Sequence, residues 1–184
     1  MRTKKEINYK VWEEFPSPLF TIDVPGYLSS AIEHLDALPS NNILHNKELY
    51  ELSYFFLQTS INYSNQLLKH SPENVKISNS KLLKFTKKNK VIIKSTKTTY
   101  LNGLFYYGEG DIDNPHAQFH NPNNYSLKSD SFDSQYTIPY RTIIFKPGRL
   151  IIYPPFINLS FSENKSKKNI NYLSFKLQAN VQEK

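Results

Sequence analysis

The fold is decided by the stretch Lys146-Pro147-Gly148-Arg149-Leu150-Ile151-Ile152-Tyr153-Pro154-Pro155-Phe156. Pro147-Gly148 is a turn signal, and Pro154-Pro155 is a second one. The apolar run Leu150–Tyr153 between them has the length and composition of a short β-strand. The stretch therefore predicts a strand that is closed at both ends by turns.

Seven further strand-like runs accompany this one after Pro72. The separators between them are rich in turn residues, such as Gly108-Glu109-Gly110-Asp111 and Asn121-Pro122-Asn123-Asn124. Eight short strands at such spacing predict a β-sandwich, a barrel or a jelly roll. The seven runs are expected at residues 75–83, 90–95, 101–107, 117–120, 140–145, 157–161 and 170–177.

The chain before Pro72 has a different pattern. A short strand is expected within residues 15–24, between Pro16 and Pro25. Apolar residues then recur at a spacing of three and four, which predicts an amphipathic helix over residues 27–38 and a longer helix over residues 47–69. Two helices ahead of the strands are positioned to cover the outer face of one sheet.

The composition excludes several classes of protein. A chain of 184 residues, 39% hydrophobic and 14% aromatic, is long enough to bury a core and fits one domain. No run of apolar residues is long enough to cross a membrane, and no apolar stretch follows the basic N-terminus as in a secretory signal. The absence of Cys rules out disulfides, thiolate metal sites and Cys nucleophiles.

Four stretches resemble the small 2-oxoglutarate/Fe(II) oxygenases that are common in marine bacteria and their phages. They are residues 15–20 with the helix that follows, 101–107, 146–156 and 171–175. Together they span nearly the whole chain in the right order. The resemblance implies a double-stranded β-helix, or jelly roll, with N-terminal helices backing the larger sheet. The expected organisation is one domain over residues 1–184, with a helical cover at 26–70 and a β core at 75–178.

The resemblance also implies an iron site, and the expected ligands are missing. Such enzymes hold Fe(II) by two His and a carboxylate, and anchor 2-oxoglutarate by an Arg. The corresponding metal-ligand positions here are Lys94, Thr96 and Leu159, and the anchor position is Ile170. None of these residues is a His, a carboxylate or an Arg. We therefore interpret all four as vacated positions and expect no cofactor, the alternative being Fe(II) and 2-oxoglutarate held elsewhere.

One cluster could replace the lost ligands. Asp113, His116 and His120 have suitable side chains for a relocated metal site. However, strand alternation over 117–120 places Phe119 inward and His120 outward. A loop with surface histidines is the favoured interpretation, and the metal site remains as an alternative.

A run of lysines raises the question of nucleic-acid binding. The net charge is +7, and lysines recur closely after residue 80. Such a surface can contact phosphates, but lysines on exposed strands also protect sheet edges from pairing. Only Phe85 lies among them as a stacking aromatic, so we favour a solvated face. The candidate basic surface comprises Lys81, Lys84, Lys87, Lys88, Lys90 and Lys97.

The leading hypothesis for function is a non-catalytic jelly roll that acts by binding. We expect its partners to be other protein chains in a larger assembly, such as a phage virion, and its location to be the virion or the cytoplasm without membrane association. The first alternative is a divergent 2-oxoglutarate/Fe(II) oxygenase with relocated ligands. The second is a basic nucleic-acid-binding module. Fold alone does not decide among them.

Overall fold

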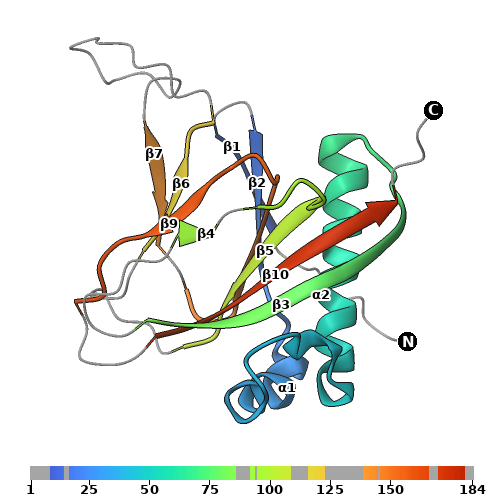
Figure 1. Cartoon of the computed structure of the whole chain (residues 1–184), viewed down its shortest axis with the longest axis vertical. Coiled ribbons are helices and arrows are strands. Elements are labelled where there is room, and N and C mark those ends of the chain that lie inside the picture. Colours follow the sequence, from blue (N-terminus) through green and yellow to red (C-terminus); the bar gives the residue numbers. More distant parts are fainter. Residues whose placement is uncertain are drawn as a thin grey trace.

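The computed structural model describes residues 9–14, 17–85, 92–93, 95–108, 116–122, 139–144, 146–165 and 170–180. At residues 9–14, 17 and 180 only the backbone is described. Two antiparallel sheets, which we call the major and the minor sheet, face each other, and a helical layer covers the far side of the major sheet (Figure 1). No helix in these parts of the chain is long and apolar enough to span a bilayer.

The eight strands from β3 onward form a set of nested pairs. β3 pairs with β10, β4 with β9, β5 with β8 and β6 with β7, so the first strand meets the last and the middle two meet each other. This nesting is that of a double-stranded β-helix, as predicted. The bounds are β3 Glu73–Phe85, β4 Ile92–Ile93, β5 Leu101–Tyr106, β6 Ala117–His120, β7 Tyr140–Ile143, β8 Arg149–Tyr153, β9 Leu159–Phe161 and β10 Ile170–Asn180.

Two N-terminal strands extend the major sheet. β1 (Tyr9–Glu14) and β2 (Ser17–Asp23) form a hairpin, and β2 pairs with β8, which gives the order β1-β2-β8-β5-β10-β3. The minor sheet has the order β4-β9-β6-β7. β2 matches the predicted strand, whereas β1 was not predicted. The β structure therefore begins before the helical cover, as the predicted strand within residues 15–24 implies, and continues to residue 180.

The helical layer differs from the prediction in its first half. The predicted helix at 27–38 is broken into two 3-10 turns, Gly26–Leu28 and Leu35–Ala37, around α1 (Ser29–Glu33), and no side chain caps α1. Serines at its start are poor helix formers, which favours the break. The longer helix is confirmed as α2 (Tyr50–Tyr63), preceded by the 3-10 turns Ile43–His45 and Lys47–Leu49 and followed by a π-helical turn, Ser64–Leu68.

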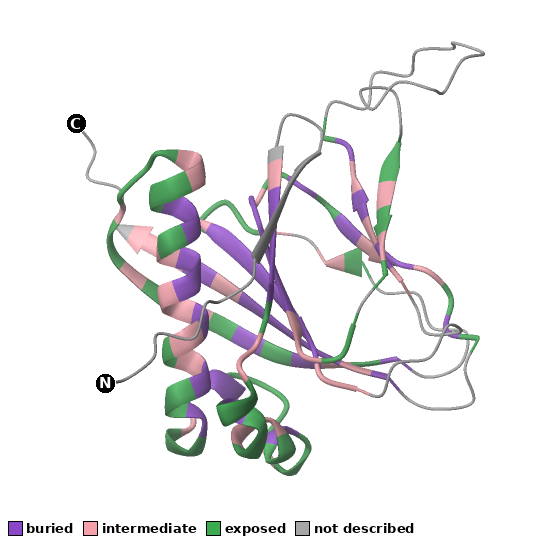
Figure 2. Cartoon of the chain, turned by 180° about the vertical axis from the view of Figure 1, so that it is seen from behind, coloured by how far each residue is buried: buried purple, intermediate pink, exposed green. Residues whose placement is uncertain are grey.

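The core on the helical side is built around aromatic rings. The long helix α2 turns its buried residues toward the major sheet (Figure 2). Phe56 of α2 stacks on Phe175 of β10 with ring centroids 5.1 Å apart and also contacts Phe105 of β5 at 5.3 Å. Gly103 lies directly beneath the Phe175 ring, and a Cβ atom there would come within 2.0 Å of it. This glycine is needed for close approach rather than for a special backbone angle. Both faces of β5 are buried, since α2 covers one face and the minor sheet the other.

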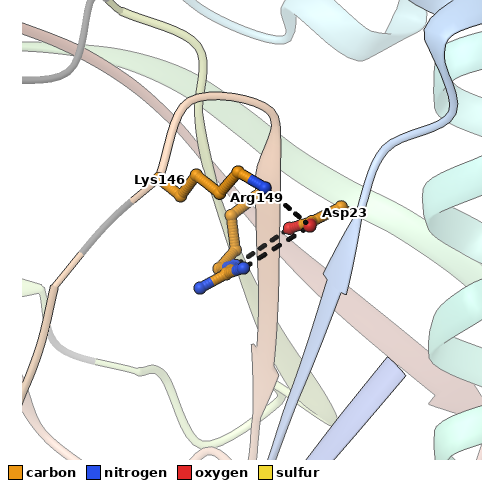
Figure 3. A network of polar contacts seen from close by, with 3 residues as sticks. All are labelled: Asp23, Lys146 and Arg149. Carbon is orange, nitrogen blue, oxygen red and sulfur yellow. Dashed lines mark hydrogen bonds and ion pairs between the residues drawn. The ribbon is translucent and has the colours of Figure 1, made fainter. Parts of the chain in front are cut away.

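An ion-pair network fastens β2 to the turn before β8. The Asp23 carboxylate accepts hydrogen bonds from Arg149 Nε at 2.9 Å and Nη2 at 3.4 Å, and lies 3.5 Å from Lys146 Nζ (Figure 3). Partial burial raises the pKa of Asp23, but the hydrogen bond and charge of Arg149, aided by Lys146, outweigh it and lower the pKa below its usual value. Gly148 adopts a left-handed conformation with φ 80° in this turn, which explains the Pro-Gly signal.

Candidate functional site

The turn between β4 and β5 contains Thr96, one of the expected ligand positions. It lies at the same end of the minor sheet as the start of β9, because Ile93 pairs with Leu159. Thr96 is exposed, and its hydroxyl hydrogen-bonds Thr99 Oγ1 at 2.8 Å. The Thr96 side chain is therefore engaged within its own turn. Lys94 lies outside the described residues.

Leu159 and Ile170, in contrast, are core residues. Leu159 is fully buried on the inner face of the minor sheet, in a cross-strand row with Ile93 and Phe119. Ile170 is 3% exposed and faces the same interior from β10. It lies at the end of β10 away from the Thr96 turn, since Leu177 at the other end pairs with the first residue of β5. The structure brings Leu159 and Ile170 into one apolar cluster and leaves Thr96 outside it.

Aromatic side chains fill much of this interior. Phe85 lies 4.5 Å from Phe161 and 5.3 Å from Tyr172 between ring centroids, and Phe161 and Tyr172 are 4.9 Å apart. Tyr106 extends the group, 5.0 Å from Tyr172. All four residues belong to the cluster that contains Leu159 and Ile170. These positions supply apolar contacts, which is the chemistry of a packed core.

Two polar side chains in this interior, Asn102 and Tyr153, carry a buried oxygen without a hydrogen-bond partner among the described residues. Asn102 of β5 lies directly opposite Tyr153 of β8. Asn102 Nδ2 donates a hydrogen bond to Ser95 Oγ at 2.8 Å, but Asn102 Oδ1 and the Tyr153 hydroxyl have no partner among the described residues. Burial raises the pKa of Tyr153, so its phenol stays neutral. Sequence reasoning missed this pair, because only the register places the two residues together.

These side chains do not fit an iron ion. Fe(II) with open coordination positions needs imidazole and carboxylate ligands on one face. Within the described ranges, no three His, Cys, Asp or Glu side chains gather closely enough to hold a metal. The interior offers apolar groups, the neutral oxygens of Asn102 and Tyr153 and, on the inner face of β7, the cationic Arg141 instead.

The histidines considered as replacement ligands lie on the other side of the minor sheet. Phe119 is buried and His120 only partly so, as strand alternation predicts. His120 Nε2 lies 2.6 Å from Ser160 Oγ. His116 directly precedes β6 and is four residues before His120, so about 13 Å of extended chain separates the two histidines. The two rings thus point away from the interior and lie far apart. Asp113 is outside the described residues.

The described lysines of the candidate basic surface do not share one face. Lys81 pairs with Ser174 and Lys84 with Asn171 in the same ladder, and a separation of three residues puts their side chains on opposite sides of the sheet. Lys97 is exposed in the turn after β4. The run of lysines is therefore not a single surface in this part of the chain. The remaining positions, Lys87, Lys88 and Lys90, lie outside the described residues.

Comparison with known proteins identifies solved structures that share this fold. No protein-family model matches the sequence, and no curated protein does. Among solved structures, a 2OG-Fe(II) oxygenase family oxidoreductase from Burkholderia pseudomallei superposes with a TM-score of 0.58 at 10% identity, over 86% of this chain and 84% of that one. The non-heme alpha ketoglutarate dependent epimerase SnoN of nogalamycin biosynthesis gives 0.58 at 12% identity, over 86% and 77%.

A prolyl-4-hydroxylase from Pseudomonas putida gives a TM-score of 0.51 at 10% identity, over 84% of this chain and 80% of that one. These superpositions establish the fold, but at such low sequence identity they leave the chemistry open. The nested strand pairs and the helical cover agree with these matches. The chain therefore has the double-stranded β-helix fold of the 2-oxoglutarate/Fe(II) oxygenases.

Proposed function

We propose that this protein keeps the oxygenase fold without its iron and 2-oxoglutarate chemistry and acts by binding. The observation that carries the proposal is Leu159. A fully buried leucine occupies the position where the resemblance expects the distal histidine ligand, within an aromatic core. A divalent ion beside it would lose hydration without gaining a ligand, which is strongly unfavourable.

The second candidate is a divergent oxygenase, and one observation favours it. Arg141 of β7 pairs with Phe119, and alternation places it on the inner face of the minor sheet with Ile143. A guanidinium there could receive the far carboxylate of 2-oxoglutarate in place of the arginine missing near Ile170. In that case the metal ligands would include residues outside the described ranges, Asp113 among them.

Metal analysis and turnover separate the two candidates. The purified protein is incubated with Fe(II), ascorbate and 2-oxoglutarate, its bound iron is measured, and succinate is followed by mass spectrometry. We expect less than stoichiometric iron and no succinate above a protein-free control. Stoichiometric iron together with succinate formation that falls in an Arg141→Gln variant would overturn the proposal in favour of the oxygenase.

The binding role is proposed to be in a larger protein assembly, of which a phage virion is one example. Exposed tyrosines on the helical layer support it, since Tyr27, Tyr50 and Tyr54 are each more than half exposed and aromatic side chains are enriched at interfaces. Size fractionation of the native source, followed with an antibody, tests this role. The chain should migrate in particles much larger than one copy, and migration as a free monomer would contradict it.

The nucleic-acid alternative has its own test. Phosphate contacts would make duplex-DNA affinity fall steeply between about 50 and 200 mM salt. Because Lys81 and Lys84 lie on opposite faces, we expect weak affinity and a shallow salt slope. A steep slope that decreases in a Lys81→Gln variant would restore this alternative.

A further inference from the structure

A cavity of about 310 Å³ is lined by β2, the C-terminal half of α2 and the π-helical turn that follows it. It lies on the side of the major sheet away from the minor sheet. This volume is at the lower end of the range for ligand sites, roughly 300–1,000 Å³. Its apolar floor and its polar wall come from different elements. The lining residues are Phe20, Ile22, Phe55, Gln58, Thr59, Asn62 and Gln66.

The polar wall is open to solvent, since Asn62 and Gln66 are exposed and Gln58 is only partly buried. Gln58, Asn62 and Gln66 make no side-chain hydrogen bond with any described residue. The same holds for Thr59, although it is only 6% exposed. The neighbouring Ser60 shows the usual alternative, because its hydroxyl donates to the Phe56 carbonyl at 2.8 Å. The lining therefore offers hydrogen-bond donors and acceptors that a ligand can use without breaking a side-chain hydrogen bond among the described residues.

The three carboxamides have the spacing of an extended polypeptide. Gln58, Asn62 and Gln66 follow one another at intervals of four residues, so they succeed each other at roughly 6 Å along one side of the helix. An extended chain repeats every two residues, at roughly 6.6 Å. Each carboxamide carries a donor and an acceptor, as each peptide group does. A peptide laid beside α2 can therefore pair its backbone with successive carboxamides.

The charge of the lining restricts the ligand further. None of the lining residues is charged, although the chain has a net charge of +7. A ligand with formal charges would bury them without a counter-charge. The floor of Phe20, Ile22 and Phe55 instead suits apolar side chains that alternate with outward-facing ones.

We propose that this groove binds a short, extended and uncharged segment of a partner polypeptide, with its backbone along Gln58, Asn62 and Gln66 and its apolar side chains on the floor. This proposal rests on the proposed function in one respect: it takes the protein to act by binding, and it adds the chemistry of the partner. The groove and the barrel interior lie on opposite faces of the major sheet. Iron-dependent turnover would overturn the proposed function and leave the groove untouched.

The test uses peptides selected on the full-length protein. A phage-displayed library of random dodecapeptides is panned against the chain, and enriched peptides are labelled and titrated by fluorescence anisotropy. We expect uncharged peptides with alternating apolar residues. Asn62→Asp keeps the shape but removes the amide donors, and should weaken binding about tenfold. The matched control is Asn65→Asp, which adds the same charge at an exposed position outside the lining and should leave affinity unchanged.

A second variant tests occupancy of the groove directly. Thr59→Leu places added bulk in the cavity and should abolish peptide binding, while a thermal melt checks that the protein remains folded. The proposal is overturned by a library that yields no binder, by equal losses in Asn62→Asp and Asn65→Asp, or by unchanged affinity in folded Thr59→Leu. Neutral oligosaccharides that bind instead, with the same dependence on Asn62, would assign the groove to carbohydrate and also overturn it.

Discussion

Removing one oxygen atom from the interior, in Tyr153→Phe, should stabilise this protein. The Tyr153 hydroxyl is fully buried and has no hydrogen-bond partner among the described residues. Such a group costs about 1–3 kcal/mol of desolvation. The phenylalanine ring keeps the edge-on contact with Phe119, whose centroid is 5.2 Å away. After allowance for the small void, we expect a gain of about 1 kcal/mol, or about 2–4 °C in Tm for a chain of this size.

The matched control is a tyrosine with the opposite expectation. Tyr63 is as buried as Tyr153, but its hydroxyl donates to the Pro18 carbonyl at 2.7 Å. Tyr63→Phe should therefore lose about 1 kcal/mol, so that the two variants differ by about 2 kcal/mol, or roughly 30-fold in the unfolding equilibrium. Urea unfolding followed by circular dichroism measures both. A Tyr153→Phe variant that is destabilised by 1 kcal/mol or more would refute the reasoning, because the hydroxyl would then have a partner, such as a ligand bound between the sheets.

Three further substitutions probe the packing and the surface network. Gly103→Ala should lower the free energy of unfolding in urea by about 1–3 kcal/mol or more, because the new Cβ overlaps the Phe175 ring. The control Gly26→Ala, which has nothing within 4 Å of its new Cβ, should have little effect. Equal effects of the two substitutions would contradict the packing around Gly103. Leu159→Ala should cost about 2–5 kcal/mol, as for a core leucine, and a neutral result would show that Leu159 is not packed as described. The pKa of Asp23 is lower in the folded chain than in the unfolded chain, so the unfolded chain binds a proton at Asp23 more readily. The ion pair of Asp23 therefore stabilises the fold above the ordinary pKa of Asp, and this stabilisation is lost as the pH falls through the folded-state pKa. Since Asp23 is half exposed, Asp23→Asn should cost less than about 1 kcal/mol at pH 7 and nothing near pH 2, and a cost that persists at pH 2 would contradict this sign.

Much of the architecture followed from local pattern. The runs at 117–120 and 149–153 became strands because turn residues bound apolar segments on both sides. The helix over 50–63 formed where apolar residues recur at three and four. The strand at 9–14 escaped prediction, since it gains its hydrogen bonds only by pairing with the strand at 17–23. Short-range patterns do not record that kind of non-local partner.

The candidate sites were less accessible from the sequence. Chain order and the resemblance indicated that Leu159 and Ile170 are not ligands, but not that both pack in one aromatic core. The pairing of Asn102 with Tyr153 depends on register, and a shift of one residue would turn either side chain to the other face. The groove is lined by residues of β2 and of α2, and these two sets of residues are some 35 positions apart in the chain.

Strand periodicity and turn chemistry are local properties, and they predicted a sandwich, a barrel or a jelly roll; the resemblance to the oxygenases singled out the jelly roll. Residue identity alone showed that Thr96, Leu159 and Ile170 are not ligand-type residues. Only the tertiary structure decided what those positions became: Leu159 and Ile170 entered the core, and Thr96 remained in an exposed turn. It also decided that Asn102 and Tyr153 keep unpartnered buried oxygens. The physical reason is that burial and hydrogen-bond satisfaction depend on which strands pair and in what register, and those contacts join residues far apart in the chain.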